Sequence, residues 1–385
     1  MGAADRALLL AALASVSAVG QTRLLVGGHS DATLTYEEFE APRLTPGSPE
    51  ATAHLRAHGY VVLAGVLNAT ELQMARELQW EFMEGSGKGI RRAEPTTWHR
   101  IKTNQYGIVW GSGAGQSAFM WYIRSAPRLV GAFAALWGID SLELLTSFEG
   151  IGMFPPVELE ASWGSPLAEG WFHTDQNGLS RPGLWTLQSF TSLFDQDATT
   201  GAFVVVPGSH LGHRGVTKRA LAEAPGTPRS QQFLMVSPDD PVLTASPPRL
   251  IRCKAGDSVV WDSRTVHCNT PGGAQRLSTV TEAPKPELRR VAAYVSMAPR
   301  YRATEQTILL RKRAVLLSQS CTHWPFEATC VPPERAPPRP PELSALQLSL
   351  AGLTAEDGLV IAEARKLYGT GRSSQRLHDD TELRL

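Results

Sequence analysis

The chain has 385 residues, of which 42% are hydrophobic, so it is long enough to bury one large core or two smaller ones. Its 37 basic and 37 acidic residues balance, which gives no electrostatic reason to expect a nucleic acid or an acidic membrane surface as a partner. Four cysteines are too few to form a disulfide framework in a chain of this length.

An apolar run of 13 residues, at positions 7–19, opens the chain. Its length matches the core of a signal peptide within residues 1–20 and is too short for a membrane span. The charges before it, Asp5 and Arg6, cancel, whereas signal peptides begin with net positive charge. A buried or amphipathic helix explains the run as well. Export therefore stays open, and a cytoplasmic or organellar location is favoured.

A Pro-containing lead-in is expected over residues 21–52, and a strand followed by an amphipathic helix over 53–83. Asn68 precedes this helix and Glu71 stands three residues later, which is the pattern of a capped helix start. Asn68 also opens a glycosylation acceptor motif, but the cap is the simpler interpretation.

The middle of the chain is predicted to hold the core strands. Residues 84–120, rich in Gly, Trp and polar residues, have weak periodicity and are assigned to a lid or to the wall of a pocket. A helix is expected over 126–144, ending near Gly138. The core strands are then expected over 145–297, interrupted at 214–246 by a Pro-rich insert that is predicted to cover the mouth of an active site.

A His-x-Asp pair, His173 and Asp175, lies in this strand-like, aromatic-rich part of the sequence. On a strand, residues i and i+2 project to the same side, so both side chains can reach one metal ion while Thr174 faces away. Such a pair is common by chance, and a surface histidine beside a turn aspartate explains it equally well without further context.

A third candidate ligand, His267, follows 92 residues later. Residues 255–257 are predicted to form a turn and 258–262 a short buried strand, and His267 falls just beyond that strand. Two imidazoles and one carboxylate are the facial triad that holds a non-haem Fe(II) and leaves positions open for oxygen and a co-substrate. The spacing therefore predicts a non-haem iron site.

Residues 288–297 are predicted to form an apolar strand that opens with Arg289 and Arg290. An iron oxygenase that uses 2-oxoglutarate needs a fixed cation for the distal carboxylate, and arginine binds a carboxylate with two parallel hydrogen bonds. Adjacent strand residues face opposite ways, so only one arginine points inward. Arg290 is favoured because its face continues with the small Ala292, and Arg289 is the alternative.

The C-terminal part is predicted to be helical. A helix is expected over 304–318, with basic residues 311–313 on a solvated face. Residues 332–341 hold six prolines in ten residues, which is typical of an extended linker. Helices over 343–368 are expected to pack on the core, and 370–385 to be a mobile tail.

Two cysteines of this part, Cys321 and Cys330, bracket an eight-residue segment. A disulfide between them is possible in an exported protein, and two buried thiols are otherwise favoured. His323 is the one histidine between them, so a zinc site there lacks ligands.

Four blocks of the sequence, in this order, resemble the phytanoyl-CoA dioxygenase (PhyH) family of Fe(II)- and 2-oxoglutarate-dependent oxygenases; they are residues 54–72, 171–175, 201–210 and 256–267. The resemblance spans residues 54–300, and its most distinctive part is the Pro-Gly-Ser-His turn that ends at His210. It implies a mainly β fold with flanking helices, whose core is a double-stranded β-helix, a cupin-like jelly roll.

The resemblance also implies roles for particular residues. His173, Asp175 and His267 match the catalytic metal ligands, and Arg290 matches the anchor of 2-oxoglutarate. Further candidates for contact with the co-substrate are Lys102, Asn269 and Phe190, the last at a position where relatives carry a Trp. His210 and His213 are assigned to structure rather than to the metal, because His210 belongs to the turn motif.

The implied reaction uses Fe(II), 2-oxoglutarate and O2 to hydroxylate a small-molecule or lipid-like substrate, releasing succinate and CO2. A cupin-like metal enzyme that does not use 2-oxoglutarate, or a non-catalytic binding module on the same fold, are the alternatives. Trp98, Trp110, Trp121 and Tyr122 are candidates for an aromatic pocket, although core packing explains such residues as often.

The implied domain division is an N-terminal extension over 1–52, the oxygenase domain over 53–301 and a helical extension over 302–385. The expected partner is a small molecule, and neither a nucleic acid nor a membrane span is expected. Neither the identity of the substrate nor the oligomeric state follows from the sequence.

Overall fold

The computed structural model of the chain describes residues 23–25, 35–104, 106–154, 171–270, 288–331, 337–338 and 340–368. The expected signal or targeting segment, the C-terminal tail and most of the expected linker over 332–341 lie outside these ranges. The division into domains is not tested by the structure and stays a prediction.

The strands form two large sheets and one small one. Sheet I consists, in spatial order, of β1 (Arg23–Leu25), β2 (Thr35–Phe39), β12 (Arg249–Ile251), β10 (Phe203–Val205), β14 (His267–Asn269), β8 (His173–Thr174) and β11 (Leu234–Met235). Sheet II consists of β3 (Arg43–Leu44), β4 (Tyr60–Leu63), β13 (Ser258–Asp262), β9 (Leu187–Ser192), β15 (Arg290–Pro299), β7 (Ile151–Phe154) and β5 (Ile108–Val109), with β6 (Leu144–Thr146) also paired to β15. The small sheet pairs β16 (Ser320–Cys321) with β17 (Cys330–Val331).

Helices and short 3-10 turns connect and cover the strands. The α-helices described are α2 (Pro49–His58), α3 (Ala69–Gly85), α4 (Ala118–Arg124), α5 (Pro127–Trp137), α6 (His213–Glu223), α7 (Pro241–Ala245), α8 (Glu305–Leu316), α9 (Ala345–Ala351) and α10 (Ala355–Tyr368). The 3-10 turns are η1 (Pro95–Arg100), η2 (Ala114–Gln116), η3 (Ser141–Glu143), η5 (Ser209–Gly212) and η7 (Arg300–Arg302).

The chain passes repeatedly between the two large sheets. β8 lies in sheet I and β9 in sheet II, and β12 to β15 alternate strictly between sheets I and II. Pairing among these strands is antiparallel, as in β10 with β14 and β9 with β15. This alternation is the double-stranded β-helix, or jelly roll, that the sequence resemblance predicted.

The alternation of side chains along β15 decides what lies between the sheets. Val295 and Met297 point away from sheet I and join the core that includes Phe133 of α5. Ala292 and Tyr294 point the other way, into a cluster shared with Phe203 and Ile251 of sheet I. Both faces of sheet II are therefore buried, and the strand residues of one parity face the interior of the jelly roll.

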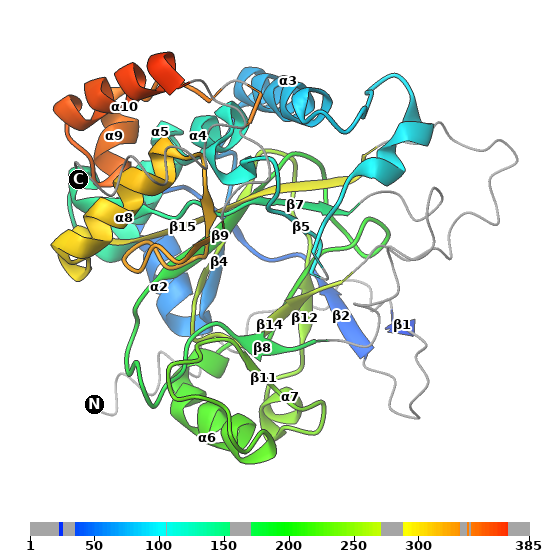
Figure 1. Cartoon of the computed structure of the whole chain (residues 1–385). Helices are drawn as coiled ribbons and strands as arrows, with labels where there is room; N and C mark the ends of the chain where they lie inside the picture. The colour runs from blue at the N-terminus through cyan, green and yellow to red at the C-terminus, as the bar shows by residue number, and fades with distance from the viewer. Residues whose placement is uncertain are drawn as a thin grey trace, which may run out of the picture.

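The helices are distributed unevenly over the fold (Figure 1). Helices α3, α4, α5 and α8 to α10 lie on the side of sheet II that faces away from sheet I, whereas α6 and α7 lie beside sheet I. Among the described helices, none alone is long and apolar enough to cross a bilayer; α9 and α10 would satisfy length and composition only as a pair bent by 96°.

Several predicted elements occur where the sequence placed them. Asn68 caps α3 and exchanges hydrogen bonds with Glu71 in a capping box. Helix α5 ends at Gly138, whose φ of 70° is left-handed. The buried strand predicted over 258–262 is β13, and Gly256 of the preceding turn has a φ of 86°.

Two expectations about connecting segments are wrong in part. The lead-in over 21–52 supplies β2, which pairs in parallel with β12, and β3, which pairs with β4. The insert over 214–246 supplies β11, which pairs with β8 at the edge of sheet I. Both segments add strands at the edges of the sheets. The strands that they pair with are distant in the sequence, so the pairing leaves no local periodic signal.

The basic run 311–313 does not form the expected solvated face. Arg311 is 1% exposed, and its guanidinium donates hydrogen bonds to the backbone carbonyls of Thr146, Pro325, Leu350 and Ala351. Because it joins the segments around α8, α9 and β6, a residue that looked solvent-facing in the sequence is a central structural contact.

Of the two states that the sequence left open for Cys321 and Cys330, the structure has the disulfide and not the two thiols. The two residues stand directly opposite each other on β16 and β17, a hairpin that the sequence pattern did not reveal. Cys253 and Cys268 are buried and take no part in a disulfide among the described residues.

Candidate active site

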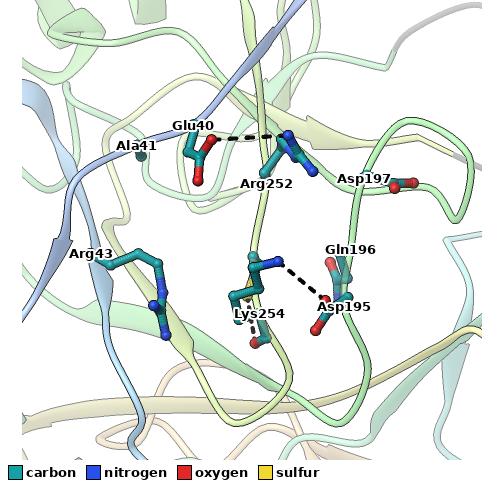
Figure 2. Close-up of a pocket in the computed structure, with 9 residues that line it drawn as sticks. Glu40, Ala41, Arg43, Asp195, Gln196, Asp197, Arg252 and Lys254 are labelled. Carbon is teal, nitrogen blue, oxygen red and sulfur yellow. Dashed lines mark hydrogen bonds and ion pairs between the residues drawn. The ribbon is translucent and has the colours of Figure 1, made fainter.

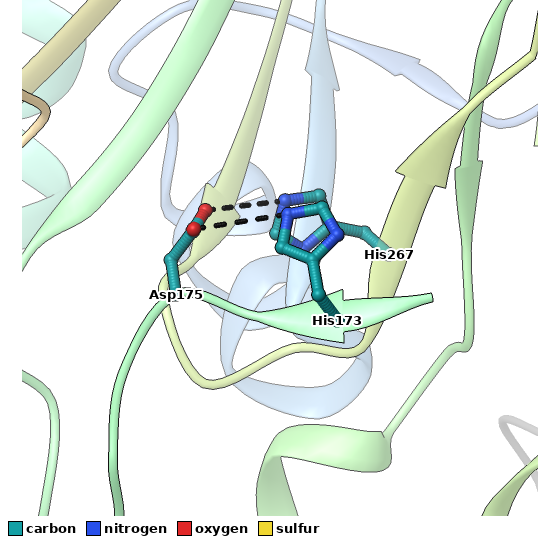
Figure 3. Close-up of side chains that lie close together, drawn as sticks. All are labelled: His173, Asp175 and His267. Carbon is teal, nitrogen blue, oxygen red and sulfur yellow. Dashed lines mark ion pairs between the residues drawn. The ribbon is translucent and has the colours of Figure 1, made fainter. Parts of the chain in front are cut away.

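Three candidate ligands from different parts of the chain meet between the sheets (Figure 3). His173 lies on β8 and His267 opens β14, and the two are direct register partners in sheet I. Asp175 follows β8 at once, where its N–H donates to the carbonyl of Ser263. The strand geometry therefore brings together the three residues that the sequence analysis singled out.

The donor atoms of these residues form a compact buried group. One ligand atom from each residue lies within 4.8 Å of the others, and all three side chains are buried. Nε2 of His173 is 3.7 Å from Oδ1 of Asp175, and Nε2 of His267 is 3.4 Å from Oδ2. The two imidazole ring centres are 4.3 Å apart.

Backbone carbonyls fix the protonation of both imidazoles. Nδ1 of His173 is 3.0 Å from the carbonyl oxygen of Trp171, and Nδ1 of His267 is 2.9 Å from that of Thr265. A carbonyl oxygen only accepts, so each Nδ1 carries the proton and each Nε2 presents a lone pair toward Asp175. Three hydrogen-bond acceptors therefore converge in a buried space.

The electrostatics of the group favour the forms that bind a metal. Burial, together with the neighbouring His267, lowers the pKa of His173 to about 3, so this imidazole is neutral. Burial by itself raises the pKa of the Asp175 carboxyl, but the surrounding imidazoles, His323 first among them, outweigh burial and hold that pKa well below its usual range. A neutral imidazole beside an ionised carboxylate is the state in which both are metal ligands.

Gln188 on β9 orients the carboxylate. Its side-chain Nε2 donates to Oδ2 of Asp175 at 2.9 Å, and both residues are buried. Sequence reasoning missed this residue, although it stands two positions before the candidate Phe190 and so shares its face of the strand. Hydrogen bonds of this kind hold ligands in place around a metal.

Arg290 faces the interior of the jelly roll, as the alternation of side chains predicted. It is 2% exposed, and its guanidinium donates to the carbonyl of Thr270 and to Oδ1 of Asn269. The ring of Phe154 lies 4.2 Å below the guanidinium carbon. Arg289 is half-buried and precedes β15.

No carboxylate forms an ion pair with Arg290 among the described residues, and its Nε has no hydrogen-bond partner there. Burial lowers the pKa of Arg290 to about 10, which leaves it charged at neutral pH. A buried, unpaired cation costs several kcal/mol. The arrangement therefore suits an anionic ligand.

Two other predicted residues border this region. Asn269 lies two residues after His267 on β14 and accepts from Arg290. Phe190 is 1% exposed and stands opposite Tyr294 in the pairing of β9 with β15, where the two rings make an edge contact at 6.4 Å. Both form part of the wall between Arg290 and the three candidate ligands.

The structure does not bring Lys102 to the same place. Lys102 is exposed, and within the described part of the chain no hydrogen bond or ion pair joins its ammonium group to the buried residues. His210 and His213 also stay apart from the group, because their Nε2 atoms bond the carbonyls of Arg56 and Gln176. The structural assignment of these two histidines agrees with their contacts.

Aromatic residues close one side of the group. Trp171 stacks on His173 with ring centres 4.5 Å apart, and Tyr106 stacks on Trp171. Phe233, from the segment predicted to cover the mouth, lies 4.6 Å from the ring of His173. The segments 84–120 and 214–246 thus both contribute to the wall, in agreement with their predicted positions.

A separate small pocket lies on the surface near β2 and β12 (Figure 2). Its charged side chains pair with one another, as Arg252 does with Glu40 and Lys254 with Asp195. Arg43 is held by the buried Asp257. Most charges of this pocket are thus paired with one another, and its Asp197 carboxylate accepts hydrogen bonds from Thr199 and Thr200.

Comparisons with known proteins agree with this site. The model of the family "Phytanoyl-CoA dioxygenase (PhyH)" matches residues 169–271. A similar curated protein is Ava biosynthesis cluster protein O of Aspergillus versicolor, which is 24% identical over 262 residues, covering 66% of this chain and 79% of that protein.

Two solved structures are also similar to this chain. The non-haem α-ketoglutarate-dependent carbocyclase SnoK from nogalamycin biosynthesis is 23% identical, with 67% of this chain and 87% of that chain covered and a TM-score of 0.42. EctD from S. alaskensis, solved with 2-oxoglutarate and 5-hydroxyectoine, is 16% identical, with 68% and 83% covered and a TM-score of 0.41.

The matched segment contains all three candidate ligands, Asn269 and the turn that ends at His210. The family predicted from the sequence blocks is thereby confirmed, and so is the predicted class of enzyme. Residues 169–271 of the chain therefore match the phytanoyl-CoA dioxygenase family, in agreement with the resemblance predicted from the sequence.

Proposed function

We propose that this chain hydroxylates a small molecule, with Fe(II) held by His173, Asp175 and His267 and 2-oxoglutarate held by Arg290. The observation that carries the proposal is a buried group of three converging acceptors close to a buried, unpaired cation. Three buried acceptors that face one another and a buried cation without a carboxylate partner are each unfavourable. A metal ion bound by the acceptors, and a dicarboxylate bound by the metal and by Arg290, would relieve both.

The donor set fits a divalent iron. Two imidazole Nε2 atoms and a carboxylate face one another without a proton between them, which is unfavourable unless a cation lies among them. Two histidines and one carboxylate on a single face are typical of non-haem Fe(II) oxygenases. Gln188 would hold the carboxylate in orientation.

The position of Arg290 fits the far carboxylate of 2-oxoglutarate. Arg290 contacts Asn269, which is two strand residues, or roughly 6.6 Å, from His267 along β14. A short dicarboxylate that binds the metal at one end can therefore reach the guanidinium with the other. The two-pronged geometry of a guanidinium suits this contact.

When bound together, Fe(II) and 2-oxoglutarate supply the oxidation of a substrate by O2, with succinate and CO2 as co-products. The chain's own residues position these groups and exclude water from them. Trp171 and Phe233 pack against the ring of His173, and Phe190 and Tyr294 line the interior with apolar surface. These side chains confine the reaction to the space between the sheets.

The test is an anaerobic titration of the protein with Fe(II) and 2-oxoglutarate, which is expected to give a weak visible charge-transfer band. The double variant Asp175→Ala, His267→Ala should lose the band, and His99→Ala, at an exposed histidine, should keep it. Absence of the band in the wild type, or its survival in the double variant, would overturn the proposal.

A second assay, which measures succinate formation in the presence of O2, separates this function from that of a metal enzyme that does not use 2-oxoglutarate. Such an enzyme would bind the metal and turn over normally in Arg290→Ala. Loss of succinate formation in Arg290→Ala with unchanged metal binding supports the proposed function.

A further inference from the structure

A second polar cluster lies further along the same face of β15. Arg290, Ala292, Tyr294 and Ser296 alternate with residues of the opposite face, so they line one side of the strand. Arg290 and Ser296 are six residues apart, which is about 20 Å on an extended strand. If 2-oxoglutarate occupies the Arg290 end, the Ser296 end remains for the substrate.

Glu149 is the central residue of this second cluster. It lies between β6 and β7, and its Oε2 accepts hydrogen bonds from the hydroxyls of Ser147 at 2.8 Å and Ser296 at 2.7 Å. Its backbone carbonyl accepts a hydrogen bond from the guanidinium of Arg124 at 2.9 Å. Burial raises the pKa of Glu149, and the Asp175 carboxylate raises it further.

The cluster is joined to the candidate metal ligands across the sheet. Ser296 stands directly opposite Gln188 in the pairing of β15 with β9, and Gln188 donates to Asp175. One strand position therefore links the Glu149 carboxylate with the carboxylate of the metal group. A substrate in contact with Glu149 lies beside the metal.

His323 reaches this region from the C-terminal segment. It lies on the loop closed by the Cys321–Cys330 disulfide, two residues after Cys321, whose N–H donates to the carbonyl of the residue before Glu149. The imidazole lowers the pKa values of both Asp175 and Glu149. Its Nε2 is buried and has no hydrogen-bond partner among the described residues. Its ring packs on Trp324, with centres 5.1 Å apart.

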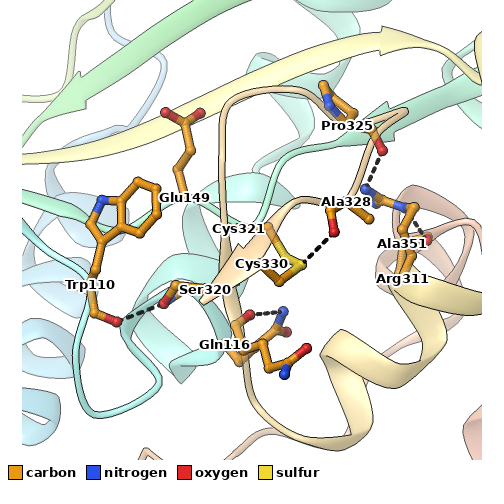
Figure 4. Close-up of a disulfide and its surroundings, with 12 residues drawn as sticks. Trp110, Gln116, Glu149, Arg311, Ser320, Cys321, Pro325, Ala328, Cys330 and Ala351 are labelled. Atoms are coloured by element: carbon orange, nitrogen blue, oxygen red, sulfur yellow. Dashed lines mark hydrogen bonds between the residues drawn. A yellow bond between two sulfur atoms is a disulfide. The ribbon is translucent and has the colours of Figure 1, made fainter. Parts of the chain in front are cut away.

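The disulfide loop is fixed beside Glu149 by backbone contacts (Figure 4). The N–H of Cys321 donates to the carbonyl of Phe148, the residue before Glu149. The hydroxyl of Ser320 donates to the carbonyl of Trp110. Trp110, Glu149 and the loop therefore lie side by side although they are far apart in the sequence.

Several buried polar atoms of this neighbourhood lack partners among the described residues. They are Nε1 of Trp110, Oε1 of Gln188 and Nε2 of His323. Buried polar atoms are normally hydrogen-bonded, and each atom left unpaired costs about 1–3 kcal/mol. Unpaired donors and acceptors in one place therefore indicate a ligand that both donates and accepts.

We propose that Glu149 and His323, with Trp110 and Gln188, form the subsite that binds the substrate, and that the substrate is an uncharged small molecule bearing hydroxyl groups. This inference rests on the proposed function, which assigns the other end of the interior to 2-oxoglutarate. Glu149 and His323 act here as specificity-determining residues.

The chemistry of the cluster selects this class of ligand. A hydroxyl group donates to a carboxylate or an amide oxygen and accepts from an indole or imidazole N–H, so it satisfies every unpaired atom named above. An acyl chain would leave all of them unpaired. Sites that bind a hydroxyl in this way reject analogues without it by large factors.

The test is ligand-observed NMR on the full chain loaded with Zn(II) in place of Fe(II) and with 2-oxoglutarate. Three compound sets of equal size serve as probes: uncharged hydroxyl-bearing small molecules, fatty acyl thioesters, and primary or quaternary amines. We expect binding compounds to concentrate in the hydroxyl-bearing set.

Two variants then assign the contacts. Glu149→Gln keeps the volume of the side chain, and His323→Phe keeps the ring contact with Trp324. Each is expected to raise the Kd of the hydroxyl-bearing compounds at least tenfold, while the Kd values for Zn(II) and 2-oxoglutarate, measured by calorimetry, change less than twofold. Glu143→Gln and His99→Phe, at exposed positions, are the matched controls and should leave every Kd unchanged.

The inference is overturned if binding concentrates in the acyl or amine set, if no compound binds, or if both variants bind like the wild type. Because the two variants lie on different elements, a folding defect in one does not prevent the test by the other. Failure of the wild type to bind Zn(II) and 2-oxoglutarate is a different result, which overturns the proposed function and the inference together.

Discussion

The two ends of the space between the sheets are built from different kinds of structure. The end with the candidate metal ligands and Arg290 is carried by strands β8, β14 and β15, with Asp175 directly after β8. The end with Glu149 and His323 is carried by the β6–β7 connection and by a disulfide-closed loop. In our proposals, the first end supplies the chemistry and the second the choice of substrate.

This difference has a physical basis. Paired strands hold side chains in a register that backbone hydrogen bonds enforce, which suits a metal whose ligands tolerate little displacement. Loops tolerate changes of length and sequence, so one scaffold can present different contacts to different substrates. Separate variants should therefore disturb one end and leave the other intact.

The largest effect is expected at the strand-built end. His267→Ala removes one of three ligands and should weaken metal binding by at least about 100-fold, since even residues that only support ligands account for 10–100-fold. Calorimetry with Zn(II) measures the change. His210→Ala, at a buried histidine that bonds a backbone carbonyl instead, is the control and should bind the metal normally.

Arg290→Met should abolish most of the affinity for 2-oxoglutarate while metal binding stays within twofold. Loss of one partner of a buried charge contact costs about 2–5 kcal/mol, which corresponds to roughly 30- to 1,000-fold in Kd. Titration of the visible band with 2-oxoglutarate measures the effect. Arg289→Met is the matched control, and a larger loss in that variant would transfer the role to Arg289.

The double variant Cys321→Ser, Cys330→Ser should act on the loop-built end alone. Removing this short cross-link is expected to lower the free energy of unfolding by about 2 kcal/mol, as measured by urea denaturation. Zn(II) and 2-oxoglutarate binding should remain as in the wild type. Weakened metal binding in this variant would show that the two ends are not independent.

The smallest effect is expected for Gln188→Leu. This variant removes the hydrogen bond that orients the Asp175 carboxylate, and metal affinity should fall about tenfold. Gln196→Leu provides the control. Gln196 is also a buried glutamine, but its side-chain amide donates a hydrogen bond to the hydroxyl of Ser192 rather than to a candidate metal ligand. Equal metal affinity in the two variants would contradict an orienting role for Gln188.

Much of the strand-built end could be predicted from the sequence because its signals are local. The spacing of His173 and Asp175, the strand before His267 and the alternation that turns Arg290 inward each depend on a few adjacent residues. The role of Lys102, whose side chain is exposed, stays a prediction. The solvated face expected near Arg311 was wrong because exposure depends on what packs against a residue. No local pattern carries that information.

The sequence by itself indicated the resemblance to the phytanoyl-CoA dioxygenase family and the jelly-roll core, and it singled out the candidate residues on the strands, since strand periodicity and short motifs are properties of neighbouring residues. Only the tertiary structure decided that β2 and β11 complete sheet I, that Cys321 pairs with Cys330, and that the loop carrying His323 is anchored next to Glu149. Those contacts join residues far apart in the chain, where closure of the whole fold, rather than local preference, sets which side chains meet.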